Sequence, residues 1–478
     1  MSRTYSRKLE TSNPRTGKVD YTAPAPNNAE LSALADQLKS AQSAWAQAGY
    51  EYRLKVLNDW LDALLAEPDE LVEALSTDTG RYLIARTEVM ALKPLLMQWA
   101  GVAAKVFAEE TPRPIAADPG VINRTELVPY SIVGVISPWN FPLLLSILDS
   151  LPALVAGCAV MTKSSEVTPR FVAPLQASID RVPELAAVWQ VLAGDGETGA
   201  ALIKQVDAIC FTGSVPTGRK VAAAAAECFI PAFLELGGKD PCIVLDSADA
   251  GQAAKTVLRA SVQATGQACQ SLERVYVQAG IAQEFLASLV AQAEAVELNY
   301  PDIHTGHIGP FIFARQADIV AGHIDDAVKQ GARVLCGGEI ETHGGGRWLR
   351  PTVLTDVNHD MQIMREETFG PVLPVMTFAT AAEAIELAND TEFGLSAAVI
   401  GDQAEAEVVG SQLNAGAISI NDGGLTTIAF EAEHHSFNCS GLGASRMGPA
   451  GLQRFLRKKA LLIRQNDAAG IESFSEGV

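Results

Sequence analysis

The pattern of apolar and polar positions divides the chain into a helical part and two later series in which strands and helices alternate. Near the N-terminus, apolar residues recur at three- and four-residue spacing, which predicts amphipathic helices. These helices are expected at residues 29–47, 51–66, 69–76 and 82–107. The preceding segment 1–28 is polar and contains turn residues, so we expect an arm or a short hairpin there.

From Ser131 onwards, short apolar runs alternate with helical patterns, a rhythm that is typical of parallel sheets. The first series predicts strands at 132–136, 159–163, 188–192, 208–211 and 233–235. The second series predicts strands at 242–245, 274–277, 397–400 and 417–420, and helices at 249–264, 281–295, 314–329 and 381–388. The strand-like segment 121–128 is expected to form a protruding ribbon between domains. The expected fold class is therefore α/β.

Composition narrows the class of protein. A length of 478 residues favours two or three domains, and a content of 48% hydrophobic and 19% charged residues indicates a compact globular protein. The formal net charge of −20 repels phosphate groups, so we expect no nucleic-acid or membrane partner. Four cations lie between Arg454 and Lys459 in a segment expected to be helical, where a solvated face or a subunit contact is the favoured use.

Neither a targeting segment nor a metal site is expected. The first ten residues have no apolar run after their charges, and the apolar stretch 143–157 is interrupted by Asp149 and Pro152, which predicts a buried helix and a cytoplasmic protein. The seven cysteines have no C-x-x-C spacing, and the seven histidines are scattered. We therefore expect reduced thiols and no bound metal.

Candidate chemistry centres on Glu235 and Cys269, each of which lies beside a turn that contains glycine. A cysteine thiolate attacks electrophilic carbon, and a carboxylate can activate the water that releases the covalent adduct. A lone glutamate is more often a capping or ion-paired residue, and a lone cysteine is more often an inert core residue. The two residue types together nevertheless predict an enzyme.

Six local sequences, in this order and spacing, resemble the aldehyde dehydrogenase superfamily over nearly the whole chain. They are residues 138–142, 161–169, 211–218, 235–239, 266–269 and 366–371. The resemblance is to the NAD(P)-dependent, hydrolytic type that does not acylate coenzyme A. It implies that Cys269 is the nucleophile, that Glu235 is the general base, and that Asn140 donates a hydrogen bond to the oxyanion. In isolation, Asn140 would more simply be an asparagine in a proline turn.

The resemblance also implies a nicotinamide cofactor and the residues that hold it. These residues are Trp139, Lys163, Glu166, Gly213, Ser214, Glu367 and Phe369. An acidic side chain such as Glu166 accepts hydrogen bonds from ribose hydroxyls and repels a 2′-phosphate, which favours NAD while leaving NADP possible. Ser214 opens a helix whose free N–H groups would attract pyrophosphate, although the turn departs from the G-x-G-x-x-G pattern. Glu367 would bond the nicotinamide ribose, and Phe369 would pack near the nicotinamide.

For the domains, the resemblance implies a Rossmann-like NAD-binding domain of residues 1–112 and 130–236, and an α/β catalytic domain of residues 237–430. Residues 113–129 and 431–478 would form oligomerisation segments, which predicts a homodimer or a homotetramer.

Three sequence features depart from that family, and a fourth matches it. Asp149 stands where many relatives have lysine, so a proton path that relies on that amine would be absent or rebuilt. Segment 437–440 is shorter than the common family loop, and the small residues 262–265 predict a roomier or more polar substrate mouth. Asn421 matches the end of a late strand and would support the site indirectly.

The implied reaction is the oxidation of an aldehyde to a carboxylic acid through a thiohemiacetal and a thioester on Cys269. Two alternatives remain open. One is a semialdehyde dehydrogenase that transfers the acyl group to coenzyme A, although known members of that group tend to lack the base at Glu235. The other is a catalytically idle relative that serves as a binding or structural subunit. No residue in the sequence identifies the aldehyde.

Overall fold

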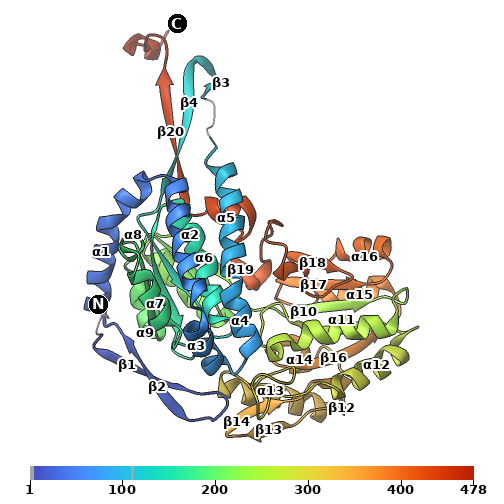
Figure 1. Ribbon diagram of the computed structural model, residues 1–478. Coiled ribbons are helices and arrows are strands. Elements are labelled where there is room, and N and C mark those ends of the chain that lie inside the picture. Colours follow the sequence, from blue (N-terminus) through green and yellow to red (C-terminus); the bar gives the residue numbers. More distant parts are fainter. Residues whose placement is uncertain (1–4, 109–111, 478) are drawn as a thin grey trace.

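The computed structural model describes residues 5–108 and 112–477 of the chain. Residues 1–4, 109–111 and 478 lie outside the described part, together with those portions of the predicted arm, first domain and C-terminal segment that fall on them. The described chain forms two α/β lobes side by side and a long β ribbon that projects from the first lobe (Figure 1). Among the described residues, none of the helices has the length and apolarity needed to cross a membrane.

The first lobe is built on a six-stranded sheet with the strand order β19-β9-β8-β5-β6-β7. Its strands are β5 (Ile132–Ile136), β6 (Ala159–Ser165), β7 (Trp189–Gly194), β8 (Ala208–Thr212), β9 (Ala232–Glu235) and β19 (Gly441–Leu442). The central pairs are parallel, whereas β19 runs antiparallel to β9. Because the carboxyl ends of parallel strands meet at one edge of a sheet, the loops after β5, β6, β8 and β9 lie along the same edge.

Helices cover this sheet and share one apolar core with it. They are α1 (Asn28–Gln47), α2 (Tyr50–Ala66), α3 (Asp69–Thr79), α4 (Tyr82–Met90), α5 (Leu92–Val106), α6 (Pro142–Ala156), α7 (Val172–Asp180), α8 (Pro183–Ala186), α9 (Gly196–Ile203), α10 (Val215–Glu227) and α17 (Gly448–Gln453). The apolar stretch 143–157 forms the buried helix α6, as predicted. The pattern over 82–107 does not form one helix: it breaks at Ala91, and α5 carries Pro94 in its first turn, where a missing N–H costs no helical hydrogen bond.

The second lobe contains a seven-stranded sheet with the order β12-β15-β16-β11-β10-β17-β18. Its strands are β10 (Asp240–Val244), β11 (Leu272–Gln278), β12 (Arg333–Cys336), β15 (Thr352–Thr355), β16 (Val372–Phe378), β17 (Ser396–Ile400) and β18 (Ala417–Ile420). Its helices are α11 (Ala250–Val262), α12 (Ala282–Glu294), α13 (Ala314–Lys329), α14 (Gln362–Arg365), α15 (Ala381–Asn389) and α16 (Gln403–Gly410). Alternate residues of β10 enter different cores, because Cys242 and Val244 pack on one face of the sheet and Ile243 packs on the other. The predicted α/β fold with parallel sheets is confirmed.

Two hairpins lie where the lobes meet. Strands β1 (Arg7–Ser12) and β2 (Val19–Ala25) form the N-terminal hairpin, and β13 (Ile340–His343) pairs with β14 (Gly346–Leu349). The N-terminal hairpin contacts both lobes: Thr11 donates to the carbonyl oxygen of Glu166 at 3.0 Å, and Arg15 donates to the carbonyl oxygen of Asn299 at 2.9 Å. This hairpin thereby links the loop after β6 to the second lobe.

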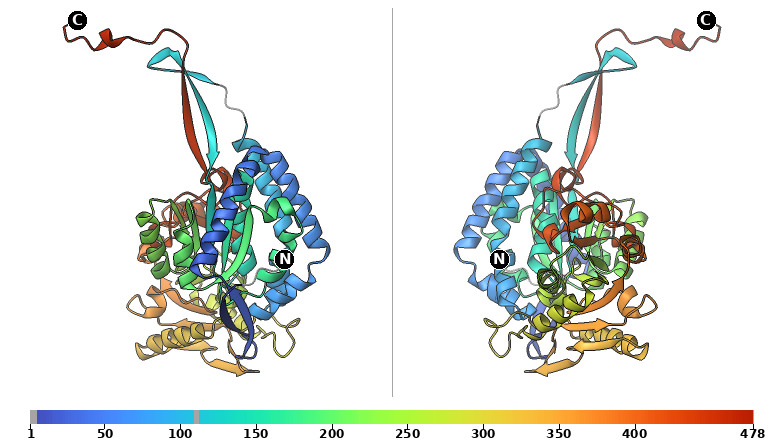
Figure 2. Two further views of the ribbon diagram at one scale, coloured as in Figure 1. Left: turned by 90° about the vertical axis from the view of Figure 1, so that its left-hand side faces the viewer. Right: turned by 90° about the vertical axis from the view of Figure 1, so that its right-hand side faces the viewer.

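The projecting ribbon consists of β3 (Arg113–Ile115), β4 (Asp118–Pro129) and β20 (Leu456–Arg464), and it extends well beyond both lobes in every view (Figure 2). The prediction of a helix over 454–459 is wrong. Residues 456–464 pair antiparallel with residues 121–129, and a continuous ladder satisfies the backbone groups that a helix would otherwise pair internally. Arg454, at the base of the ribbon, is buried rather than solvated.

Candidate active site

Cys269 ends a strained loop that follows helix α11. The three consecutive residues Ala264, Thr265 and Gly266 have φ angles of 56°, 61° and 66°, which place them in the left-handed region. For a residue with a Cβ, and above all for a β-branched one, this conformation costs on the order of 1–3 kcal/mol. A side chain at Gly266 would collide with the carbonyl group of Gly370, so glycine is required there. Such strain persists where surrounding contacts over-determine the backbone.

Those contacts come from Gln267 and from a segment distant in sequence. The buried Gln267 amide accepts from the N–H of Ile312 at 2.9 Å and donates to the carbonyl oxygen of Pro310 at 3.2 Å. The Thr265 hydroxyl donates to the carbonyl oxygen of Gly309 at 3.0 Å. The loop that presents Cys269 is therefore fixed by hydrogen bonds across the lobe.

Asn140 reaches this loop from the other lobe. It follows β5 and is 3% exposed, and its side-chain amide donates to the carbonyl oxygen of Gln267 at 2.9 Å. Arg81 holds both segments, because its guanidinium donates to the carbonyl oxygens of Asn140 and Ala264. The structure thus brings the predicted oxyanion donor beside the backbone of the predicted nucleophile.

Glu235 lies at the end of β9, where the chain enters the Gly237–Gly238 turn. Its carboxylate accepts from the hydroxyl of Ser436 at 2.6 Å. A Cβ at Gly238 would lie 2.8 Å from the carbonyl oxygen of Cys269, so the turn packs directly against the nucleophile's backbone. A glycine is needed at this point for the close approach of the two backbone segments.

Cys269 is partly exposed, and its thiol lies among carboxylates. Burial raises its pKa to about 12, and Asp240, Glu367 and Glu235 add to the rise, whereas Arg446 opposes it. The sulfur is therefore a neutral thiol near neutral pH. Attack requires the thiolate, so cationic charge near the sulfur favours activation.

Glu367 folds over the Gly237–Gly238 turn. Its carboxylate accepts from the N–H of Gly238 at 3.2 Å, and a Cβ at Gly237 would lie 2.5 Å from it. Burial, with the nearby charge of Glu273, raises the pKa of Glu367 to about 8. Glu273 also anchors the segment that carries Glu367, because it accepts from the backbone N–H groups of Thr368 and Phe369 at 2.8 and 2.7 Å.

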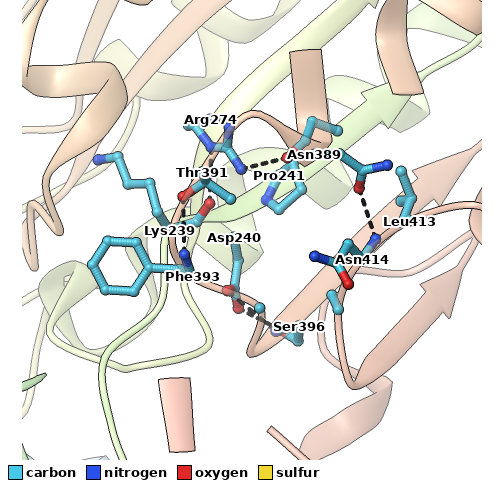
Figure 3. Close-up of a pocket in the computed structure, with 13 residues that line it drawn as sticks. Lys239, Asp240, Pro241, Arg274, Asn389, Thr391, Phe393, Ser396, Leu413 and Asn414 are labelled. Atoms are coloured by element: carbon cyan, nitrogen blue, oxygen red, sulfur yellow. Dashed lines mark hydrogen bonds between the residues drawn. The ribbon is translucent and has the colours of Figure 1, made fainter. Parts of the chain in front are cut away.

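Behind this turn, charged side chains fix the start of β10. Lys239 donates to Glu273 at 2.8 Å, and Asp240 accepts from the N–H of Ser396 at 3.2 Å. Arg274 donates to the carbonyl oxygen of Ala388 at 2.8 Å. A small pocket is lined by Lys239, Asp240, Arg274, Ala388 and Ser396 (Figure 3). These partners all belong to the second lobe, so this pocket braces the turn that follows Glu235.

An aromatic group lies between the two lobes. The rings of Trp139 and Phe369 meet edge to face with centroids 5.4 Å apart, and Phe313 lies 6.2 Å from Trp139. Phe369 has a φ of 54°, a conformation that Glu273 holds through the Phe369 N–H. The predicted cofactor residues Trp139 and Phe369 are therefore in contact with each other.

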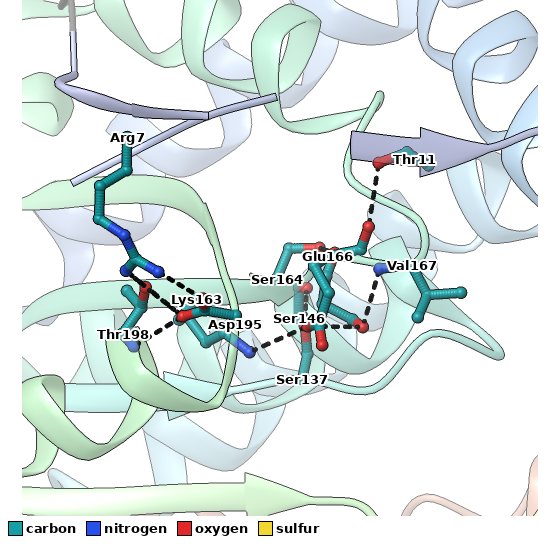
Figure 4. A network of polar contacts seen from close by, with 11 residues as sticks. Arg7, Thr11, Ser137, Ser146, Lys163, Ser164, Glu166, Val167, Asp195 and Thr198 are labelled. Atoms are coloured by element: carbon teal, nitrogen blue, oxygen red, sulfur yellow. Dashed lines mark hydrogen bonds and ion pairs between the residues drawn. The ribbon is translucent and has the colours of Figure 1, made fainter. Parts of the chain in front are cut away.

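A polar network follows β6, at the same edge of the first sheet (Figure 4). Lys163 is 5% exposed, and its ammonium lies 3.9 Å from the carboxylate of Glu166, which is 44% exposed. Burial lowers the pKa of Lys163 against the opposing effect of Glu166. Next to them, Arg7 pairs with Asp195 at 2.5 Å. A buried cation and a partly exposed carboxylate can both bond the hydroxyl groups of a ribose.

Gly213 and Ser214 open helix α10 after β8. Ser214 is exposed, and its hydroxyl donates to Thr217 at 3.2 Å rather than capping the helix. The backbone N–H groups in the first turn of a 13-residue helix can therefore bind an anion. Together with Lys163 and Glu166, this arrangement fits a dinucleotide.

Several residues of the site were not predicted from the sequence. Arg81, Glu273, Ser436 and Arg446 contact the predicted residues or shift the pKa of Cys269, yet each lies far from its partner in sequence. Asp149 is not part of an amine path, because it pairs with Arg446 and Arg454. Asn421 accepts from the N–H of Gly401 at 2.9 Å, which places it in the second sheet.

Two lobes that bring a cysteine, a carboxylate and an asparagine to the edge of a dinucleotide-type sheet define a cofactor-dependent enzyme with a covalent step. The family model of the aldehyde dehydrogenase family matches residues 1–461. The chain therefore belongs to the aldehyde dehydrogenase family. It is an oxidoreductase that oxidises aldehydes with NAD(P).

Three similar proteins match this chain over nearly its full length. The chain is 50% identical to a solved structure named "Putative Aldehyde Dehydrogenase PutA" from Anabaena variabilis, with a TM-score of 0.95 and coverage of 97% of this chain and 99% of that one. It is 34% identical to the "Putative succinate-semialdehyde dehydrogenase", NADP(+), of Mycolicibacterium smegmatis, over 93% of this chain and 87% of that protein. Betaine aldehyde dehydrogenase from Staphylococcus aureus, solved with NAD+, is 28% identical, with a TM-score of 0.91 and coverage of 99% and 95%.

Proposed function

We propose that Cys269, Glu235 and Asn140 carry out the oxidation of an aldehyde to its carboxylic acid, with hydrolysis of a thioester on Cys269. The observation that supports this most strongly is the meeting of three distant segments: Asn140 bonds the carbonyl of Gln267, and the Gly237–Gly238 turn after Glu235 packs on the carbonyl of Cys269.

The first step is the addition of the Cys269 thiolate to the aldehyde carbon. A carbon–sulfur bond forms, and the carbonyl π electrons move to oxygen, where the Asn140 amide and the backbone N–H of Cys269 stabilise the negative charge. The oxyanion collapses to a thioester as hydride leaves the carbon, and NAD(P)+, when bound, accepts that hydride.

The second step is hydrolysis, for which Glu235 takes a proton from water. The hydroxide equivalent adds to the thioester carbon, the carbon–sulfur bond breaks, and the thiolate and the carboxylic acid separate. Ser436 orients the Glu235 carboxylate through the 2.6 Å hydrogen bond. Because this base is present, we favour water over coenzyme A as the acyl acceptor.

We further propose that NAD is the preferred cofactor. Lys163 and Glu166 would hold the adenosine ribose, Gly213 and Ser214 the phosphates, and Trp139, Glu367 and Phe369 the nicotinamide end. The carboxylate of Glu166 lies 3.9 Å from Lys163 and would repel a 2′-phosphate. The relative from M. smegmatis is named for NADP(+). Substitution of Glu166 therefore tests whether its carboxylate sets the preference for NAD.

We propose a cytoplasmic homo-oligomer whose NAD-binding domain spans residues 1–112 and 130–236 and whose catalytic domain spans 237–430. Residues 113–129 and 431–478, which include the projecting ribbon, would bridge subunits.

The experiment compares wild type with Cys269→Ala on acetaldehyde, hexanal, benzaldehyde and succinate semialdehyde, each with NAD+ and NADP+. We expect NADH formation with at least one aldehyde in wild type and its loss by several orders of magnitude in the variant. Cys228→Ala, which removes an exposed cysteine, is the matched control. Equal rates in wild type and Cys269→Ala would overturn the proposal, and added coenzyme A that is consumed stoichiometrically would favour acyl transfer instead.

A further inference from the structure

A buried group of three charges lies at the middle of helix α6. Asp149 is 1% exposed, Arg446 is 6% exposed and Arg454 is 7% exposed. Arg446 binds Asp149 with two hydrogen bonds, Nε to Oδ1 at 3.1 Å and Nη2 to Oδ2 at 2.8 Å. Arg454 donates to the same carboxylate. Two guanidinium groups on one carboxylate leave this buried group with an excess positive charge.

The excess charge lies on the side of Glu235. Strand β19 pairs with β9 so that Gly441 is opposite Glu235, and the chain that continues from β19 leads to Arg446. Arg446 donates to the hydroxyl of Thr212, and Thr212 is the partner of Glu235 in the parallel pair β8–β9. Arg446 is therefore fixed between Asp149 behind it and the strand neighbour of the base in front of it.

The pKa shifts of the neighbouring groups agree with this position of Arg446. Burial opposes ionisation of Asp149, but Arg446 and Arg454 hold its pKa below the ordinary value. Burial also opposes the charge on Arg446, yet Asp149 and then Glu235 raise its pKa, so the guanidinium stays protonated. Of the charged groups that act on the thiol of Cys269, Asp240, Glu367 and Glu235 raise its pKa, whereas Arg446 lowers it.

We propose that Arg446 is a positioning residue for the hydrolytic step: held by Asp149 and Arg454, it supplies a permanent cation beside Glu235 that offsets the negative charge of the neighbouring carboxylates. The inference rests on the proposed roles of Cys269 and Glu235. An arginine suits this task because it does not lose its proton, so the charge does not vary with pH. Three charged or titratable groups lie close to Glu235 and Arg446, namely Cys269, Asp240 and Glu367. Lys239 lies beside Glu367, and Cys210 lies beside the arginines.

The test uses 4-nitrophenyl acetate, which needs neither a cofactor nor knowledge of the aldehyde. The Cys269 thiolate adds to the ester carbonyl, the bond to nitrophenolate breaks, and an acetyl thioester remains. Water activated by Glu235 then cleaves the carbon–sulfur bond and releases acetate. The initial burst of nitrophenolate reports acylation, and the later steady rate reports hydrolysis.

Three variants separate charge from packing. Arg446→Met removes the cation but leaves Arg454 paired with Asp149, so no buried charge is left alone. Arg446→Lys keeps a cation without the paired hydrogen bonds. Arg53→Met is the matched control, because Arg53 is also a buried arginine but donates to carbonyl groups of helices α1 and α6 away from the site.

We expect Arg446→Met to retain a nitrophenolate burst while its steady rate at pH 7 falls at least tenfold. The acid limb of its pH–rate profile should move to higher pH, because the cation beside the reacting groups is lost. Arg446→Lys should recover most of the rate and the wild-type profile, and Arg53→Met should keep that profile.

Superimposable profiles of wild type and Arg446→Met would overturn the inference while leaving the roles of Cys269 and Glu235 intact. An equal loss in Arg446→Lys and Arg446→Met, with no shift of the acid limb, would also overturn it, because packing rather than charge would then matter. If Cys269→Ala released nitrophenolate with the wild-type burst, the proposed function itself would fail, and that result is distinguishable from the other two.

Discussion

The side-chain amide of Asn140 donates to the carbonyl oxygen of Gln267 at 2.9 Å. This hydrogen bond joins the loop after β5 in one lobe to the loop that ends at Cys269 in the other. An amide carries two N–H donors, so one can hold the loop while the second binds the oxyanion. The donor is thereby set relative to the sulfur before any substrate arrives.

Replacement of Asn140 by alanine should therefore lower kcat by about 10²- to 10³-fold, the range seen when one oxyanion donor is lost. Asn140→Asp should be equally impaired, since a carboxylate of the same size cannot donate. Steady-state kinetics with the best aldehyde give the result, and NAD+ binding by calorimetry serves as the control for folding. An aspartate variant within tenfold of wild type would contradict the assigned role.

The raised pKa of Cys269 predicts slow alkylation in the absence of cofactor. With a pKa of about 12, the thiolate fraction at pH 8 is on the order of 10⁻⁴. Because the neutral thiol is favoured below this pKa, the thiolate fraction rises about tenfold per pH unit. The alkylation rate should rise by the same factor from pH 7 to pH 10. Iodoacetamide labelling with mass spectrometry of the Cys269 peptide measures this, with the exposed Cys228 as an internal comparison. A rate at Cys269 that is already level at pH 7 would be inconsistent with its surroundings.

Removal of the Glu166 carboxylate should relax cofactor preference. Glu166→Ala should raise kcat/KM with NADP+ by at least tenfold, because Lys163 would then face a 2′-phosphate without the neighbouring negative charge. Glu197→Ala is the matched control, since Glu197 pairs with Arg7 at 3.3 Å nearby but not with Lys163. The same shift in both variants would point to general charge instead of a specific contact.

Glu88 links pH to stability. It accepts from the N–H groups of Leu143 and Leu144 at the start of α6, and burial raises its pKa to about 7. Because the pKa of Glu88 is higher in the folded state, protonation of its carboxyl group favours folding. This contribution to stability is fully present below the unfolded pKa of about 4.5 and is lost as pH rises through about 7. Glu88→Gln should therefore show a flatter dependence of the free energy of unfolding on pH between 5 and 7.

The expected difference for Glu88 is about 3 kcal/mol at most, from a shift of roughly 2.5 pH units at 1.36 kcal/mol each. Urea unfolding at several pH values measures it. The exposed Glu70→Gln should keep the wild-type slope, and identical slopes for wild type and Glu88→Gln would contradict the account.

The sequence predicted most strands of the two large sheets, because apolar runs such as 132–136 and 397–400 are buried on both faces and bounded by turns. It failed at 454–459, where a ladder with the distant strand β4 overrode a local pattern. Local motifs also indicated Cys269, Glu235 and Asn140. They could not indicate Arg81, Ser436 or the Asp149–Arg446 pair, whose contacts arise only when segments far apart in the chain fold together.

The most direct test of the account is the fate of Glu235→Gln mixed with NAD+ and the panel aldehyde that wild type oxidises fastest. The account predicts one equivalent of NADH per active site, followed by a stalled acyl thioester that intact-protein and peptide mass spectrometry place on Cys269. Continued turnover at the wild-type rate, or an adduct on a different cysteine, would contradict it.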